Sequence, residues 1–162
     1  MKTKRVTAGI GRLITGGIDV STEENVQLIR RFFAEIDRAN LDGLDGICTD
    51  DYGVQFPGVP GPLDRAGAKH LFGAFVAAFP GISHGIEETV AEGDKVATRL
   101  TVRGTHRGEF QGIPPTGKDI TITALNIFRI AGGRIASHWI EYDAVGMLQQ
   151  LGVMPAPGGA GA

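Results

Sequence analysis

The sequence predicts one α+β domain in which helices come first and an antiparallel sheet follows. In the first half of the chain, apolar residues recur at three- and four-residue spacing, which is typical of amphipathic helices. In the second half, the period changes to two, which is typical of strands. Two joints between the strand-like segments are short enough for hairpins. Helices followed by meandering strands favour α+β over alternating βαβ units.

The composition fits one globular domain and excludes two classes of protein. The 162 residues are 42% hydrophobic, which is enough apolar mass for a core. Lys+Arg 16 against Asp+Glu 18 leaves no basic stripe, so we expect no nucleic-acid partner. No apolar run approaches the roughly 20 residues that span a bilayer, so we expect no membrane partner. The single cysteine, Cys48, can form no intrachain disulfide, which fits a cytoplasmic location.

Three helices are expected before the sheet. The first starts at the capping box Ser21–Glu24. Its apolar side comprises Val26, Ile29, Phe33 and Ile36. A short second helix is expected over 41–48, and a strand over 52–56. The third helix is capped by Asp64 and ends at Pro80.

The sheet is expected from four segments with alternating polarity, at roughly 82–91, 95–105, 119–131 and 134–142. Residues 92–94 and 131–133 predict turns, whereas the joint over 107–118 is a longer, proline-rich loop. A last short helix follows Asp143 and ends at Gly152.

The chain ends differ in composition from this domain, which we place at residues 21–154. Residues 1–20 begin with a basic cluster, but Arg12 interrupts the apolar stretch that a secretory signal would need. We therefore predict a flexible N-terminal arm over 1–20. Residues 155–162 offer almost nothing to bury, which predicts a disordered tail.

Two patterns in the sequence could indicate a phosphate-binding loop or a metal site, but both are incomplete. The spacing Gly112 to Lys118 fits G-x-x-x-x-G-K, but Asp119 follows and two prolines remove amide donors from the loop. The histidines have no close H-x-x-x-H pairing, and Cys48 has no C-x-x-C partner. We therefore expect neither a bound nucleotide nor a metal ion.

Four separated segments of the chain carry a resemblance to a known family. They are Ala91–Val96, Gly104–Gly117, Arg129–Ile135 and His138–Gly152. In this order and with these gaps, they resemble the SnoaL-like polyketide cyclases over about residues 22–154. The resemblance implies the nuclear-transport-factor-two-like fold, also described as a cystatin-like α+β barrel. In that fold a curved antiparallel sheet wraps over the helices to form a cone-shaped apolar pocket.

The resemblance also implies a function. Members of this family close a ring on a hydrophobic polyketide-like molecule in secondary metabolism, by an aldol step that needs no cofactor. Relatives with this fold isomerise, dehydrate or open epoxides, and many form homodimers through the outer face of the sheet. Alternation places Arg99 and Arg103 on that outer face. We therefore expect a homodimer with a hydrophobic small-molecule substrate and no cofactor.

Three positions depart from the family's pattern. The acid/base aspartate of the polyketide cyclases aligns with Ile140, a pocket histidine with Asn126 and a pocket glutamine with Ala124. An isoleucine cannot transfer a proton. We expect a cyclase or isomerase that works by general acid/base catalysis, but two alternatives stay open. One is a non-catalytic protein that binds a hydrophobic small molecule, and the other is an epoxide hydrolase or epoxide-opening ether cyclase.

The epoxide alternative needs a carboxylate in the pocket. The nearest carboxylates to position 140 in the sequence are Glu141 and Asp143. Alternation turns Glu141 outward, and Asp143 stands where it would cap the last helix.

Four residues are candidates for the chemistry. His138 is the expected proton carrier, because histidine changes charge near pH 6.5. Asn126 could hold a carbonyl or enolate oxygen, and Tyr52 could donate to a substrate oxygen. His106 is expected at the mouth of the cone, as in some ether-ring-closing relatives. Each of the four could instead be a structural residue.

Seven further residues are expected to form the wall of the substrate pocket. They are Phe33, Phe75, Ala124, Phe128, Trp139, Ile140 and Tyr142.

Overall fold

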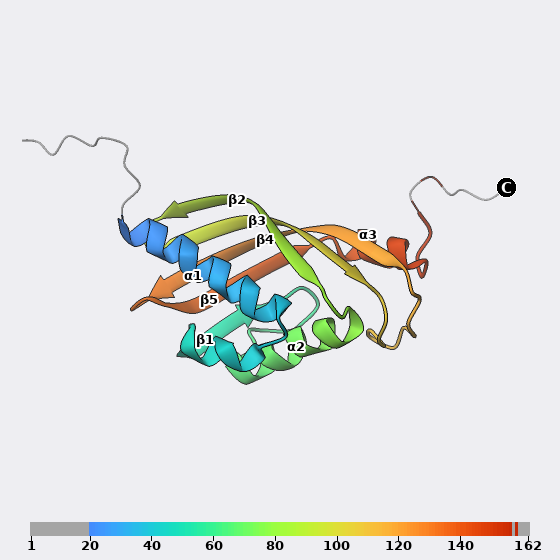
Figure 1. Cartoon of the computed structure of the whole chain (residues 1–162), viewed down its shortest axis with the longest axis horizontal. Coiled ribbons are helices and arrows are strands. Elements are labelled where there is room, and N and C mark those ends of the chain that lie inside the picture. The colour runs from blue at the N-terminus through green and yellow to red at the C-terminus, as the bar shows by residue number, and fades with distance from the viewer. Residues whose placement is uncertain (1–19, 157, 159–162) are drawn as a thin grey trace, which may run out of the picture.

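A computed structural model describes residues 20–156 and 158. The predictions for the N-terminal arm and for most of the C-terminal tail concern residues outside this range. The elements in chain order are α1 Val20–Asp37, the 3-10 helix η1 Leu41–Gly46, β1 Cys48–Gln55, α2 Arg65–Ala78, β2 Ser83–Glu92, β3 Lys95–Thr105, β4 Asp119–Ala131, β5 Arg134–Tyr142 and α3 Ala144–Leu151 (Figure 1). The α+β class is confirmed.

The five strands form one curved, unclosed sheet in the order β1-β5-β4-β3-β2. The pairs β2–β3, β3–β4 and β4–β5 are antiparallel, as predicted. The edge strand β1 instead runs parallel to β5, so the sheet is mixed. The prediction of a purely antiparallel sheet was wrong for this pair, because a helix separates β1 from the hairpins and permits either direction.

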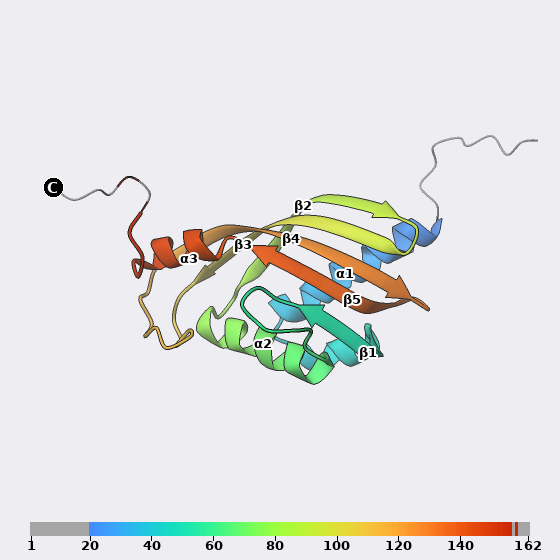
Figure 2. The ribbon, with the colours of Figure 1, turned by 180° about the vertical axis from the view of Figure 1, so that it is seen from behind.

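α1 and α2 lie on one face of the sheet (Figure 1, Figure 2). α1 crosses this face and α2 lies below it beside β1 (Figure 1), whereas the strands lie in front of α1 when the molecule is seen from behind (Figure 2). Burial alternates along β4: Ile122, Ala124 and Asn126 are buried, whereas Leu125 and Ile127 are exposed. β4 therefore presents alternate side chains to the interior beneath the helices.

The element boundaries follow the predicted signals at α2 and α3. The side chain of Asp64 accepts from the backbone N–H of Gly67, and Asp143 accepts from that of Gly146. Gly152 adopts the left-handed conformation with φ 77°, which ends α3. These three predictions are confirmed.

Two boundaries near the N-terminus were wrong. Ser21 already lies within α1, so it does not precede the first helical residue as a cap would. The strand predicted over 52–56 begins at Cys48, because the stretch predicted as a helix over 41–48 ends after one 3-10 segment at Gly46.

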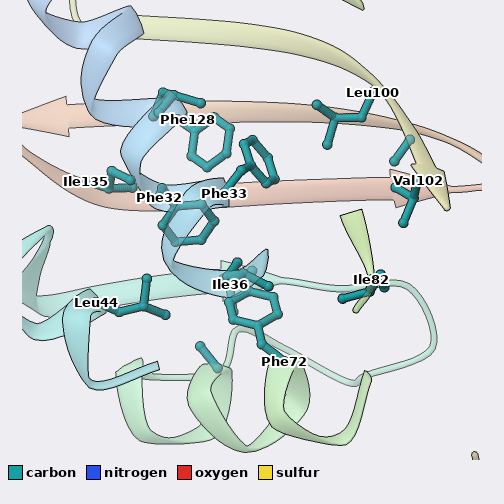
Figure 3. Packing of buried hydrophobic residues seen from close by; sticks show 14 of the residues in the cluster. Phe32, Phe33, Ile36, Leu44, Phe72, Ile82, Leu100, Val102, Phe128 and Ile135 are labelled. Atoms are coloured by element: carbon teal, nitrogen blue, oxygen red, sulfur yellow. The ribbon is translucent and has the colours of Figure 1, made fainter. Parts of the chain in front are cut away.

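An aromatic cluster joins the two layers. Phe32 of α1 is fully buried and packs edge to face against Phe72 of α2, with ring centroids 5.9 Å apart, and against Phe128 of β4, at 5.5 Å. Figure 3 shows these rings pointing toward one another between the helices and the sheet. The cluster fixes the distance between α1, α2 and the concave face of the sheet.

Candidate functional site

A cavity lies beside this aromatic cluster, between the helices and the concave face of the sheet. Its volume is about 80 Å³. At about 10–15 Å³ for each water, this volume has room for about five to eight water molecules. The lining residues are Phe32, Phe33, Ile36, Phe56, Phe72, Phe75, Ile82, His84, Leu100, Val102, Ile122, Ala124, Asn126, His138, Ile140 and Tyr142. Most of this wall is aromatic or aliphatic.

A buried hydrogen-bonded chain of three side chains reaches this cavity. Nε2 of His138 lies 2.8 Å from Oδ1 of Asn126, and Nδ1 of His138 lies 3.2 Å from the hydroxyl of Tyr52. An amide oxygen can only accept, so Nε2 carries the proton of the neutral ring. Nδ1 then accepts from the Tyr52 hydroxyl. The hydrogen bonds therefore run in one direction, from Tyr52 through His138 to Asn126.

The buried environment keeps the hydrogen-bonded side chains of His138 and Tyr52 uncharged. Burial, and to a smaller extent the nearby His84, lower the pKa of His138 to about 3. Burial also raises the pKa of Tyr52 well above its ordinary value. His138 is therefore neutral near pH 7, with both ring nitrogens engaged. The interpretation of His138 as a proton carrier that titrates near pH 6.5 needs correction, because burial disfavours its charged form.

The direction of these hydrogen bonds leaves one donor free, the amide nitrogen of Asn126. Asn126 Oδ1 is used by His138, while the buried Nδ2 has no partner among the described residues. Thr98 stands opposite Asn126 in the β3–β4 register, and its hydroxyl is also buried without a partner in the described structure. Buried polar groups are nearly always satisfied. Asn126 is thus a candidate donor to a ligand oxygen.

A second polar pair lines the cavity at the end of α1. Nδ1 of His84 lies 2.6 Å from Oδ1 of Asp37, and Oδ2 of Asp37 accepts from the backbone N–H of His84 at 3.2 Å. The ring of His84 stacks on Phe33, with centroids 5.2 Å apart. Sequence analysis missed this pair. The residues are far apart in the chain, and no local spacing links a helix end to the start of a strand.

Most of the predicted wall residues do line the cavity, namely Phe33, Phe75, Ala124, Ile140 and Tyr142. Phe128 is fully buried behind the lining, where it stacks on His138 with centroids 4.0 Å apart. Trp139 is a correction: it is 38% exposed and does not line the cavity. Its neighbours His138 and Ile140 both line the cavity, so alternation along β5 turns Trp139 to the outer face.

His106 lies away from the cavity lining, so its expected place at the mouth of the cone also needs correction. It is fully buried and stacks on Phe79, with centroids 5.2 Å apart. Its Nδ1 accepts from the backbone N–H of Thr116 at 3.2 Å. His106 thereby holds the long loop that follows β3 against α2, which is a structural role.

The two carboxylates next to position 140 lie outside the cavity. Glu141 is exposed, and Asp143 caps α3. Within residues 20–156 and 158, no three His, Cys, Asp or Glu side chains are grouped closely enough to hold a metal ion. None of the helices in the described part of the chain is long and apolar enough to cross a membrane.

Fold and cavity together define a protein built around a small-molecule pocket, as in the nuclear-transport-factor-two-like folds. The sequence model of the SnoaL-like polyketide cyclase family matches residues 27–151. The chain therefore belongs to the SnoaL-like polyketide cyclase family, as the sequence resemblance implied.

Solved structures of similar proteins agree with this assignment. IdmH from Streptomyces antibioticus, a proposed polyketide cyclase, is 36% identical with a TM-score of 0.72, covering 78% of this chain and 97% of its own. TsrD from Streptomyces laurentii is 28% identical, with a TM-score of 0.73 and coverage of 85% and 100%. AclR from Streptomyces galilaeus, a proposed hydroxylase, is 27% identical, with a TM-score of 0.76 and coverage of 83% and 85%. No curated protein sequence matched the chain.

Proposed function

We propose that this protein is a cyclase or isomerase that acts on an apolar, polyketide-like small molecule by cofactor-free acid/base catalysis. The family membership supports the reaction class. The observation that carries the proposal is the free amide N–H of Asn126, which is buried at the wall of an apolar cavity. A fixed donor in a mostly apolar site stabilises an oxygen that gains negative charge, as in an enolate.

The hydrogen-bonded chain supports this role of Asn126. Tyr52 and His138 fix the amide so that its oxygen points toward the imidazole and its nitrogen is left free. No rearrangement is then needed when charge develops on the substrate oxygen. In this proposal His138 and Tyr52 orient Asn126, and neither transfers a proton.

The size and lining of the cavity support a small, flat substrate. Its volume corresponds to a molecule of about one ring, and two-ring systems require the walls to open. Phe33, Phe72 and Phe75 line it and provide ring faces for stacking. We therefore propose one- or two-ring aromatic ketones or esters as the substrate class.

The alternative is a protein that binds such a molecule without converting it. The isoleucine at position 140 and the neutral His138 favour this second function, since neither can supply a proton. The epoxide-opening alternative has less support, because Glu141 and Asp143 lie outside the cavity.

Hydrogen–deuterium exchange of 1-tetralone separates catalysis from binding. This two-ring ketone carries exchangeable hydrogens on the carbon next to its carbonyl, and their removal gives an enolate. In D₂O, followed by proton NMR, we expect the protein to accelerate exchange and Asn126→Ala to slow it by about 10²-fold. Binding of 1-tetralone without faster exchange would favour the non-catalytic function instead.

A matched control is Asn25→Ala. Asn25 is half-buried on α1, where its amide donates to the backbone carbonyl of Gly93, and it is not among the residues that line the cavity. We expect this variant to exchange 1-tetralone at the wild-type rate. Equal rates for wild-type protein and Asn126→Ala would contradict the role of Asn126.

We also propose that the protein is a homodimer in the cytoplasm. The outer face of the sheet exposes Leu125, Ile127 and Trp139, which are 59%, 46% and 38% exposed. Ile127 pairs with Trp139 across β4 and β5, so the three form one apolar patch. Sedimentation should give a dimer, and Ile127→Asp should give a monomer.

The single, buried Cys48 supports a reducing compartment.

A further inference from the structure

We propose that His84, positioned by Asp37, is the base that removes a proton from a carbon acid bound in the cavity. The inference rests on the proposed function and supplies the base that this function needs. Asn126 is a donor for an oxygen, and the other buried histidine has both nitrogens engaged. The cavity therefore needs a group with a free lone pair.

The geometry of the pair provides that lone pair. Oδ1 of Asp37 lies 2.6 Å from Nδ1 of His84, and a carboxylate oxygen accepts, so the proton of the neutral ring is on Nδ1. Nε2 then carries the lone pair and has no partner among the described residues. A histidine held by a carboxylate in this way has the arrangement of a general base.

Two anchors hold the ring in place. Asp37 also accepts from the backbone N–H of His84 at 3.2 Å, so both carboxylate oxygens are committed to the same residue. The imidazole stacks on Phe33, which itself lines the cavity. The side chain of His84 is only 14% exposed. Its orientation is therefore fixed at the cavity wall, yet solvent can still reach the ring to remove or return a proton.

The other polar groups of the lining are weaker candidates for the base. His138 is engaged at both nitrogens, as described above. The Tyr142 hydroxyl is a poor base when neutral, and burial raises the pKa of this group, so the phenolate is disfavoured. Asn126 has no basic lone pair at its nitrogen. His84 is left as the base.

The proposed step balances within the site. Nε2 of His84 takes the proton from the carbon next to a carbonyl, and the C–H electron pair forms the enolate, whose negative oxygen accepts from the Asn126 amide. The enolate carbon then attacks a second carbonyl, or is reprotonated elsewhere, and the imidazolium of His84 returns the proton to the product. No oxidant, reductant or co-reactant is consumed, as an isomerisation or ring closure requires.

The probe for this base is 5-nitrobenzisoxazole, which reports proton removal independently of any polyketide-like substrate. A base takes the proton from its C3 atom, the C–H pair forms the nitrile, and the N–O bond breaks to release 2-cyano-4-nitrophenolate. The release is followed by visible absorbance. We expect the wild-type protein to catalyse this elimination, and His84→Gln to lower kcat/KM by about 10²-fold.

Asp37→Asn tests the positioning of the base without changing the size of the side chain. The new amide oxygen still accepts from the backbone N–H of His84, while the amide NH₂ donates to Nδ1 and forces the proton onto Nε2. We expect elimination to fall by about 10²-fold although the fold is retained. Nitrogen NMR of the imidazole should show Nδ1 protonated in the wild type and Nε2 protonated in Asp37→Asn, a change that a merely structural role would not produce.

The matched control is His70→Gln. His70 is an exposed histidine on α2 and lies outside the cavity lining, so its loss should leave the elimination rate unchanged. The inference is overturned if the wild type does not accelerate the elimination, if His84→Gln retains the wild-type rate, or if Nε2 is protonated in the neutral wild-type ring.

The elimination assay tests His84 as the base, and the 1-tetralone exchange assay tests the proposed function. The failure of one can therefore be told from the failure of the other. If elimination depends on His84 but 1-tetralone does not exchange, the base is present and the proposed function is wrong. If 1-tetralone exchanges at an enhanced rate while His84→Gln leaves both reactions unchanged, the proposed function survives and another group is the base.

Discussion

The neutral state of buried His138 predicts a specific loss of stability in acid. Its pKa is about 3 in the folded protein, against 6.5 for an exposed histidine. Between these two values the unfolded chain binds a proton that the folded protein does not bind. The contribution of His138 to stability is therefore fully present above about pH 6.5 and decreases as the pH falls, by about 1.4 kcal/mol per pH unit.

The magnitude can be worked out for an accessible range. From about pH 7.5 to about pH 5, the linkage relation gives a loss of about 2 kcal/mol from His138. This loss is nearly the same whether the folded pKa is about 3 or about 4, because both values lie well below the range. His138→Gln keeps a hydrogen-bonding side chain but cannot titrate, so it should lack this loss.

The assay is urea unfolding followed by circular dichroism at both pH values. The wild-type free energy of unfolding should fall by about 2 kcal/mol more than that of His138→Gln, while other titrating groups cancel in the difference. His70→Gln, which removes an exposed histidine, should keep the wild-type pH dependence. Equal pH dependence in the wild type and His138→Gln would show that His138 is not held neutral by burial, as would NMR signals showing that its ring becomes protonated between these pH values.

Three further predictions concern stability and are measured by the same unfolding experiment. Asp64→Ala removes the cap that accepts from the start of α2 and should cost about 1 kcal/mol; no loss would contradict the cap. Phe32→Ala empties the centre of the aromatic cluster and should cost about 3–5 kcal/mol, and a cost below about 1 kcal/mol would contradict its central position. Gly108→Ala places a methyl group against the backbone carbonyl of Ala77 and should cost about 1–3 kcal/mol. Its control, Gly46→Ala, meets no neighbouring atom and should change stability by less than about 0.5 kcal/mol.

Elements with strong local signals could be predicted from the sequence. Strand alternation located β4 and β5 and placed His138 and Ile140 on the same face. The caps Asp64 and Asp143 marked the starts of α2 and α3. These signals are local, since each depends on residues within a few positions of one another.

Features that depend on contacts distant in the chain could not be predicted. The parallel pairing of β1 with β5 joins residues more than eighty positions apart, such as Val54 and His138. Local patterns do not specify such a pairing. Burial of His138 depends on Phe32 and Phe128 from other elements, so the sequence alone could not reveal its lowered pKa.

A crystal structure of the protein with 1-tetralone bound would show whether Asn126 and His84 act on the same ligand. We expect the ketone inside the cavity, with its carbonyl oxygen about 3 Å from Nδ2 of Asn126 and the adjacent carbon facing Nε2 of His84. A ketone bound on the outer surface, or one whose carbonyl points away from Asn126, would rule out Asn126 as the donor to the substrate oxygen.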